Sequence, residues 1–121
     1  MRYTDQDKTI IKLNEDTRIK KTVWKMTKTI PSTVGGEEKL LDYAYTTQVA
    51  DRILRLYKYR YKSYVDEEQY MFTEGHRLEF IDDEGKGLWE FPQTDYLRDL
   101  YETVRLKTAN IESFFSKYLN E

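Results

Sequence analysis

The clearest hydrophobic pattern in the chain runs from Thr94 to Leu119 and has the period of an α-helix. Its apolar and aromatic positions fall within one arc of about 140° on a helical projection, wide enough to pack on a core. They are Tyr96, Leu97, Leu100, Tyr101, Val104, Thr108, Ile111, Phe114, Phe115, Tyr118 and Leu119. Pro92 cannot continue a preceding regular element, and Thr94 or Asp95 can cap the first free N–H groups. The pattern therefore predicts one long helix.

A second helix is predicted from Glu37 to about Val65, after the breaker-rich segment 31–36. Acidic residues at its start favour the N-terminus of a helix. Seven positions share one face in the helical phase: Tyr43, Ala50, Ile53, Leu54, Tyr57, Tyr61 and Tyr64. The alternation of tyrosines with basic residues over 57–62 would also fit a strand. We prefer the helix because its phase explains more residues over a longer window.

Between these segments, residues 77–91 have the pattern of a β-hairpin. A turn centred on Glu84 and Gly85 predicts three cross-strand pairs: Leu78 with Phe91, Glu79 with Glu90, and Phe80 with Trp89. The apolar pairs would form a buried aromatic layer against the helices. The two glutamates would lie opposite each other on the outer face, which is mildly unfavourable unless a cation sits between them.

The N-terminal pattern fits two structures. Thr9–Leu13 and Thr17–Ile30 can form a β-hairpin, because the second run is rich in β-branched residues. A helical stripe also fits four positions: Ile19, Val23, Met26 and Ile30. With strands preferred, we expect a single α+β domain over residues 1–121, in which two long helices pack on a small antiparallel sheet in the order ββαββα.

Composition limits the class of protein. The 121 residues are 39% hydrophobic and 35% charged, with a net charge of −2 and no cysteine, which is typical of a soluble globular domain. No stretch approaches the roughly 18 apolar residues of a membrane span, and no secretory signal is apparent, so we expect a cytoplasmic protein. Eleven tyrosines against three alanines indicate an AT-rich coding sequence, such as that of a low-GC bacterium or a phage.

The small net charge conceals a strong segregation of charge. Residues 52–64 carry five basic and no acidic residues, whereas residues 66–92 carry nine acidic and two basic residues. In the predicted second helix, one outer face combines cations with a tyrosine: Arg52, Arg55, Lys58, Tyr59 and Lys62. Such a face can contact a phosphate backbone while the ring stacks on a base, although a solvated helix exterior has the same appearance.

The acidic block gathers at the predicted hairpin and can dock on a basic surface of a protein partner, such as a nucleic-acid-handling protein. The residues concerned are Glu79, Asp82, Asp83, Glu84 and Glu90. The ordinary alternative is that they solubilise the turn or pair with the basic segments.

Candidate chemistry is sparse. The chain has no cysteine and one histidine, His76, which excludes thiol nucleophiles and sites that need two histidines. No serine lies in a Gly-x-Ser-x-Gly elbow, no glycine-rich phosphate loop is present, and the acids do not have the spacing of a calcium loop. We therefore expect a non-enzymatic interaction protein without cofactor or metal, for example a mobile-element or phage-type regulator or inhibitor that docks charged surfaces on a protein partner. Direct nucleic-acid binding is the alternative.

Overall fold

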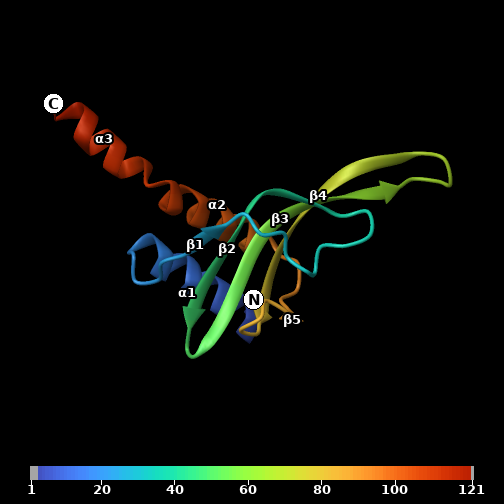
Figure 1. Ribbon diagram of the computed structural model, residues 1–121, viewed down its shortest axis with the longest axis horizontal. Helices are drawn as coiled ribbons and strands as arrows, with labels where there is room; N and C mark the ends of the chain where they lie inside the picture. The colour runs from blue at the N-terminus through green and yellow to red at the C-terminus, as the bar shows by residue number, and fades with distance from the viewer. Residues whose placement is uncertain (1–2, 121) are drawn as a thin grey trace.

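The computed structural model describes residues 3–120, which form three helices and five strands (Figure 1). In chain order the elements are α1 (Asp5–Arg18), β1 (Lys25–Thr27), β2 (Lys39–Val49), β3 (Arg52–Tyr64), β4 (Tyr70–Ile81), β5 (Gly87–Glu90), α2 (Asp95–Ala109) and α3 (Ile111–Leu119). Each strand pairs antiparallel with its sequence neighbours, so the sheet order is β1-β2-β3-β4-β5. The α+β class is confirmed, but the order αβββββαα replaces the predicted ββαββα.

The main core lies between one face of the sheet and the two helices α1 and α2, which lie side by side (Figure 1). Alternate residues of a strand point to opposite faces, so only every second residue of β3 and β4 enters this core. The core residues are Ile10, Leu13, Trp24, Tyr45, Leu54, Leu56, Leu78, Phe91, Leu97, Leu100, Tyr101 and Val104.

The prediction of a strand at Thr9–Leu13 is wrong, because these residues lie within α1. The Thr4 hydroxyl accepts a hydrogen bond from the Asp7 N–H at 3.1 Å, and the Asp7 carboxylate accepts one from the Thr4 N–H at 3.4 Å. This reciprocal capping box stabilises the helix start. Of the predicted second strand only Lys25–Thr27 forms, and the alternative helical stripe does not form either.

The predicted helix from Glu37 to Val65 is also wrong, because its residues form β2 and β3. The turn between these strands consists of Ala50 and Asp51, which both have positive φ, 50° and 63°, as in the tight turns of β-hairpins. β3 then pairs with β4 continuously from Ile53 to Tyr64. This long-range pairing favours the strand over the helical phase, because aromatic side chains pack well on a pleated surface.

The predicted hairpin over 77–91 is confirmed, and its predicted register holds as far as Phe80; the pairing then shifts by one residue, so that Ile81 lies opposite Gly87. Glu79 lies opposite Glu90 and Phe80 lies opposite Trp89. The N–H of Phe91 donates to the Leu78 carbonyl at 2.8 Å. Leu78 and Phe91 are buried as expected, but Trp89 remains 45% exposed, so helices do not cover the whole aromatic layer.

The predicted helix from Thr94 to Leu119 is interrupted at Asn110, whose backbone is left-handed with φ 56° and ψ 44°. Asparagine adopts this conformation more readily than most residues. α2, before the break, buries four residues in the core, whereas α3, after it, buries none of its nine. Figure 1 shows α3 projecting away from the sheet and the other helices.

Candidate interaction surfaces

Two residues that the sequence assigned to different surfaces pair with each other inside the protein. Arg55, 6% exposed, and Glu79, 1% exposed, lie directly opposite in β3 and β4. Arg55 Nη2 lies 3.0 Å from Glu79 Oε2, and Arg55 Nη1 donates to the Gly85 carbonyl at 2.9 Å. The Thr33 hydroxyl donates to Glu79 at 2.7 Å and accepts from Arg55 at 3.1 Å. The pair is therefore part of the interior and ties the connection between β1 and β2 to the sheet.

A second arginine, Arg77, extends this network on the same face. It donates to the two carboxylate oxygens of Glu38 at 2.8 and 3.1 Å and to the Tyr57 hydroxyl at 2.8 Å. The hydrogen bonds from Arg77 lower the pKa of Glu38, and burial raises the pKa of Tyr57 to about 12. Glu90, one of the candidate docking acids, has a carboxylate oxygen 3.3 Å from Arg77 Nε. These contacts favour a structural role for the network.

The acidic turn between β4 and β5 is partly used to form itself. The Asp82 carboxylate accepts from the N–H groups of Glu84 at 2.9 Å and Lys86 at 2.8 Å, as turn-forming aspartates do. Asp83 and the side chain of Glu84 are exposed. Of the five candidate docking acids, these two present their charge most directly to solvent.

The five candidate nucleic-acid residues do not form one face, because β3 is a strand. Arg55 and Tyr59 are buried on the face that carries the arginine network. The other three point to the opposite face. There Lys58 lies 3.0 Å from Glu74, and the Arg52 guanidinium lies 4.5 Å from the centre of the Phe80 ring. The predicted basic surface is therefore divided between two sides of the sheet.

The same strand builds a different exposed surface. β3 and β4 extend beyond the rest of the sheet from Tyr61 onward, because Arg60 is the last residue of β3 that pairs with β2. We define the resulting two-stranded arm, with this junction included, as residues 60–74 (Figure 1). One face of the arm carries a set of cations and rings, which we call the cation–aromatic face: Arg60, Lys62, Tyr64, Tyr70 and Phe72. Its three rings are between 47% and 54% exposed. Glu74 lies on the same side at the base of the arm, where it pairs with Lys58.

The side chains of the cation–aromatic face contact one another in a row. The Arg60 guanidinium lies 4.3 Å from the centre of the Phe72 ring, and the Lys62 ammonium lies 4.5 Å from that of Tyr70. The Tyr70 ring is 5.9 Å from Tyr64 and 5.6 Å from Phe72, centre to centre. The alternation of tyrosines with basic residues in 57–62 places the cations on this face and the tyrosines on the other, whereas the rings beside the cations come from Tyr64 and, across the pairing with β4, from Tyr70 and Phe72.

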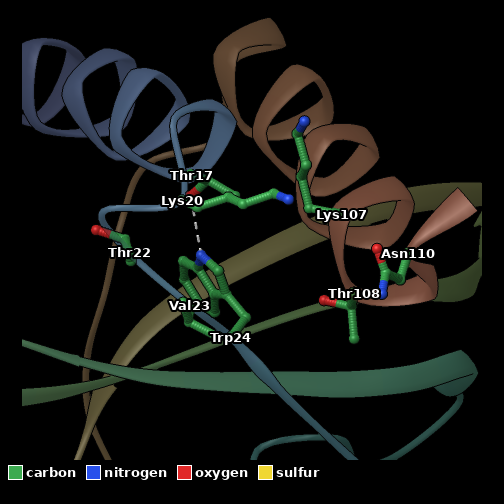
Figure 2. Close-up of a pocket in the computed structure, with 8 residues that line it drawn as sticks. All are labelled: Thr17, Lys20, Thr22, Val23, Trp24, Lys107, Thr108 and Asn110. Carbon is green, nitrogen blue, oxygen red and sulfur yellow. Dashed lines mark hydrogen bonds between the residues drawn. The ribbon is translucent and has the colours of Figure 1, made fainter. Parts of the chain in front are cut away.

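A cavity of about 220 Å³ lies between the C-terminal ends of α1 and α2 (Figure 2). It is lined by Thr17, Lys20, Thr22, Val23, Trp24, Lys107, Thr108 and Asn110. The Trp24 indole N–H donates to the Thr17 hydroxyl at 3.0 Å, and that hydroxyl donates to the Leu13 carbonyl at 2.6 Å. Neither an acid nor a histidine is among these described lining residues.

The position of His76 is explained by the packing of its ring against the protein interior. Its ring lies 5.2 Å from that of Tyr101, centre to centre, and burial lowers its pKa. Within residues 3–120, no three acidic or histidine side chains gather in a way that could hold a metal ion. In the same part of the chain, no helix is long and apolar enough to cross a membrane.

The chain was compared with protein-family models, with curated proteins and with solved structures, and none of the three comparisons found a match. The function is therefore inferred from the chain's own residues.

Proposed function

We propose that the chain is a non-enzymatic interaction protein that binds another protein through the cation–aromatic face of the arm. The observation that carries this proposal is the row of three half-exposed rings on a projecting ribbon. Tyrosine, phenylalanine and arginine are enriched in protein interfaces and dominate their binding energy. A two-stranded ribbon is also only marginally stable in water by itself, so a partner that covers one face stabilises it.

The chemistry of the face specifies the partner surface. Arg60 and Lys62 place positive charge directly over the rings of Phe72 and Tyr70. Such an arrangement complements an apolar surface bordered by carboxylates, because ion pairs across the interface offset part of the cost of removing the two cations from water. The expected partner is therefore a protein with an apolar patch and an acidic rim.

Single-stranded nucleic acid is the second candidate, because rings that alternate with cations can stack on bases. The charge of the arm disfavours it. Residues 60–74 contain four acidic and two basic residues, and three of the acids, Asp66, Glu67 and Glu68, lie at the tip. Phosphate groups would be repelled there, whereas a protein surface can match both signs of charge.

The test begins with capture of binding partners from a cell extract by the full chain, with and without nuclease. The captured protein is then purified, and its Kd is measured for wild type, for Tyr70→Thr/Phe72→Thr, and for the control Met71→Thr. Met71 is equally exposed but lies on the opposite face of the arm. Threonine keeps the strand propensity in all three positions.

We expect the double substitution to weaken binding by at least about tenfold, as loss of a central aromatic contact does, and Met71→Thr to change it little. Capture that disappears after nuclease treatment would favour nucleic acid. Equal Kd values for the double variant and wild type would show that the arm is not the binding surface.

A further inference from the structure

α3 exposes an apolar face with no cover inside residues 3–120. Five of its nine residues are large and apolar, and they are between 39% and 80% exposed: Ile111, Phe114, Phe115, Tyr118 and Leu119. On a helical projection they occupy one arc of about 140°. The Phe114 ring lies 5.6 Å from Phe115 and 5.7 Å from Tyr118, centre to centre, so the face is one contiguous cluster.

A helix of this length and exposure requires packing. Isolated helices shorter than about 12 residues are marginal in water, and helices in proteins take most of their stability from burial of an apolar face. The Lys107 ammonium lies 2.8 Å from the Glu112 carboxylate, which holds the first turn of α3 against the end of α2. That contact orients α3 but leaves its apolar face in water.

We propose that α3 packs antiparallel against α3 of a second copy of this chain and so forms a two-fold dimer. The area is sufficient. Aromatic side chains bury about 150–250 Å² each, so the three half-exposed rings present roughly 300 Å² per chain, and with Ile111 and Leu119 the exposed face is on the order of 500 Å². Two copies would bury about 1,000 Å², which is the lower limit expected for a specific interface.

The charges on α3 also fit a second copy. The helix carries one acid, Glu112, in its first turn and one base, Lys117, in its last turn. In an antiparallel pair the first turn of each helix lies at the same end as the last turn of the other, so each end of the pair carries one charge of either sign and no like charges accumulate there; Glu112 keeps its contact with Lys107 of its own chain. The helix dipoles oppose each other as well. A partner with a strong charge of one sign would find no complementary charge on this face.

The surface continues beyond α3 at its base. Asn110 and Val23 both line the cavity between α1 and α2, and Val23 is exposed (Figure 2). The dimer surface can therefore extend onto the residues before β1. The arm lies at the opposite end of the molecule, so dimerisation through α3 is independent of the function proposed for the arm (Figure 1).

The experiment is sedimentation equilibrium of the full chain over a range of concentrations, for wild type and for Phe114→Gln/Phe115→Gln. Glutamine retains helix propensity, and both rings are exposed in the monomer, so the fold is preserved. Leu106→Gln is the matched control, because Leu106 is an exposed apolar residue of α2 that lies outside the α3 cluster. We expect a dimer for wild type and the control, and at least tenfold weaker association for the double variant. Helical circular dichroism should rise with concentration for wild type and the control but not for the double variant.

The antiparallel orientation is tested with cysteines, which the natural sequence lacks. Chains carrying Ile111→Cys and Tyr118→Cys are mixed and oxidised. Disulfides between the two different variants are expected, whereas disulfides between like variants would overturn the antiparallel arrangement. A wild-type chain that remains monomeric at all concentrations would overturn the proposed dimer, and so would a monomeric chain that binds lipid vesicles instead. Equal dimerisation of wild type and Phe114→Gln/Phe115→Gln would show that the dimer does not form through α3.

Discussion

The ring of Tyr59 lies over Gly75, its cross-strand neighbour in β4. A Cβ at position 75 would lie 2.8 Å from both Cζ and the hydroxyl oxygen of Tyr59, closer than such atoms approach. The ring is buried and packs between Tyr57, at 6.2 Å, and Tyr61, at 5.8 Å. The absence of a side chain at Gly75 therefore makes room for the row of tyrosines on the second face of the sheet.

Gly75→Ala should destabilise the protein by about 1–3 kcal/mol, the usual cost of overpacking, because the added methyl group must displace Tyr59. The measurement is the free energy of unfolding from urea denaturation. Gly35→Ala is the control, since no atom lies within 4 Å of a Cβ built at that exposed position. Equal effects of the two substitutions would contradict the contact between Tyr59 and Gly75.

Because Arg55 and Glu79 form a buried ion pair, substitutions of the two residues should have non-additive effects on the free energy of unfolding. Glu79→Leu leaves the arginine charge buried without its partner and should cost about 3–5 kcal/mol. The double substitution Arg55→Met/Glu79→Leu removes both charges and should cost less than the single one. Urea denaturation of the variants measures this difference.

An exposed pair provides the comparison for this experiment. Arg105 and Glu102 lie 2.8 Å apart on α2, and both side chains are nearly half exposed. Glu102→Gln should therefore change the free energy of unfolding by less than about 1 kcal/mol. If Glu79→Leu proved no more costly than Glu102→Gln, the buried pair would not contribute as proposed.

The lowered pKa of Glu38 should make the stability of the folded protein depend on pH in the acidic range. Arg77 lowers the pKa of Glu38 in the folded state below the ordinary value of about 4.3. As the pH falls, the unfolded chain therefore takes up this proton first. The stabilisation is fully present above the ordinary pKa and is lost as the pH falls through the folded-state pKa. The urea midpoint of wild type should accordingly fall more steeply below about pH 5 than that of Glu38→Gln. If the urea midpoints of the two proteins fell in parallel as the pH is lowered, the contribution of Glu38 would be refuted.

The exposed acids of the turn between β4 and β5 predict an effect on rate. Asp83→Asn/Glu84→Gln removes charge without disturbing the turn, because the turn contacts come from Asp82. Stability should change by less than about 0.5 kcal/mol. This turn is separate from the arm, so the effect concerns a partner surface other than the acidic rim that faces the arm. Association with a partner that presents a basic surface to this turn should slow, most clearly at low salt. Stopped-flow measurements over a salt series give the association rate. The control is Glu15→Gln/Asp99→Asn, which removes two exposed acidic charges away from the turn. Unchanged rates would leave these acids a solubilising role only.

The hydrophobic pattern predicted the structure correctly where the residues that pack together are close in sequence. The hairpin over 77–91 has its predicted register at Glu79 and Phe80, because its two strands are joined by a short turn and alternate in the same phase; next to the turn the pairing shifts by one residue. The first half of the C-terminal helix was likewise predicted correctly, since its apolar stripe meets the core over Leu97–Val104. The burial of Trp89 was overestimated, because its place in β5, at the edge of the sheet, leaves it half exposed.

The hydrophobic pattern did not predict the structure where both the helical and the strand periodicity fit the same residues. The tyrosine-rich segment 52–64 satisfies both a helical and an alternating pattern, and continuous pairing with β4 selects the strand. That choice moved Arg55 and Tyr59 to the interior and left Lys62 beside the exposed rings of the arm. The candidate binding surface changed with it, because a helix and a strand distribute the same residues over different faces.

The sequence by itself determined the α+β class, the register of the hairpin over 77–91, and the strong segregation of charge, because these depend on composition and on neighbours along the chain. The tertiary structure decided which charges reach the surface. Arg55 and Glu79, 24 residues apart, are brought face to face by strand pairing, and their opposite charges compensate one another in the interior. It also decided that the apolar arc of the last helix splits at Asn110, because the left-handed backbone there ends α2, whose residues reach the core, and begins α3, none of whose residues is buried.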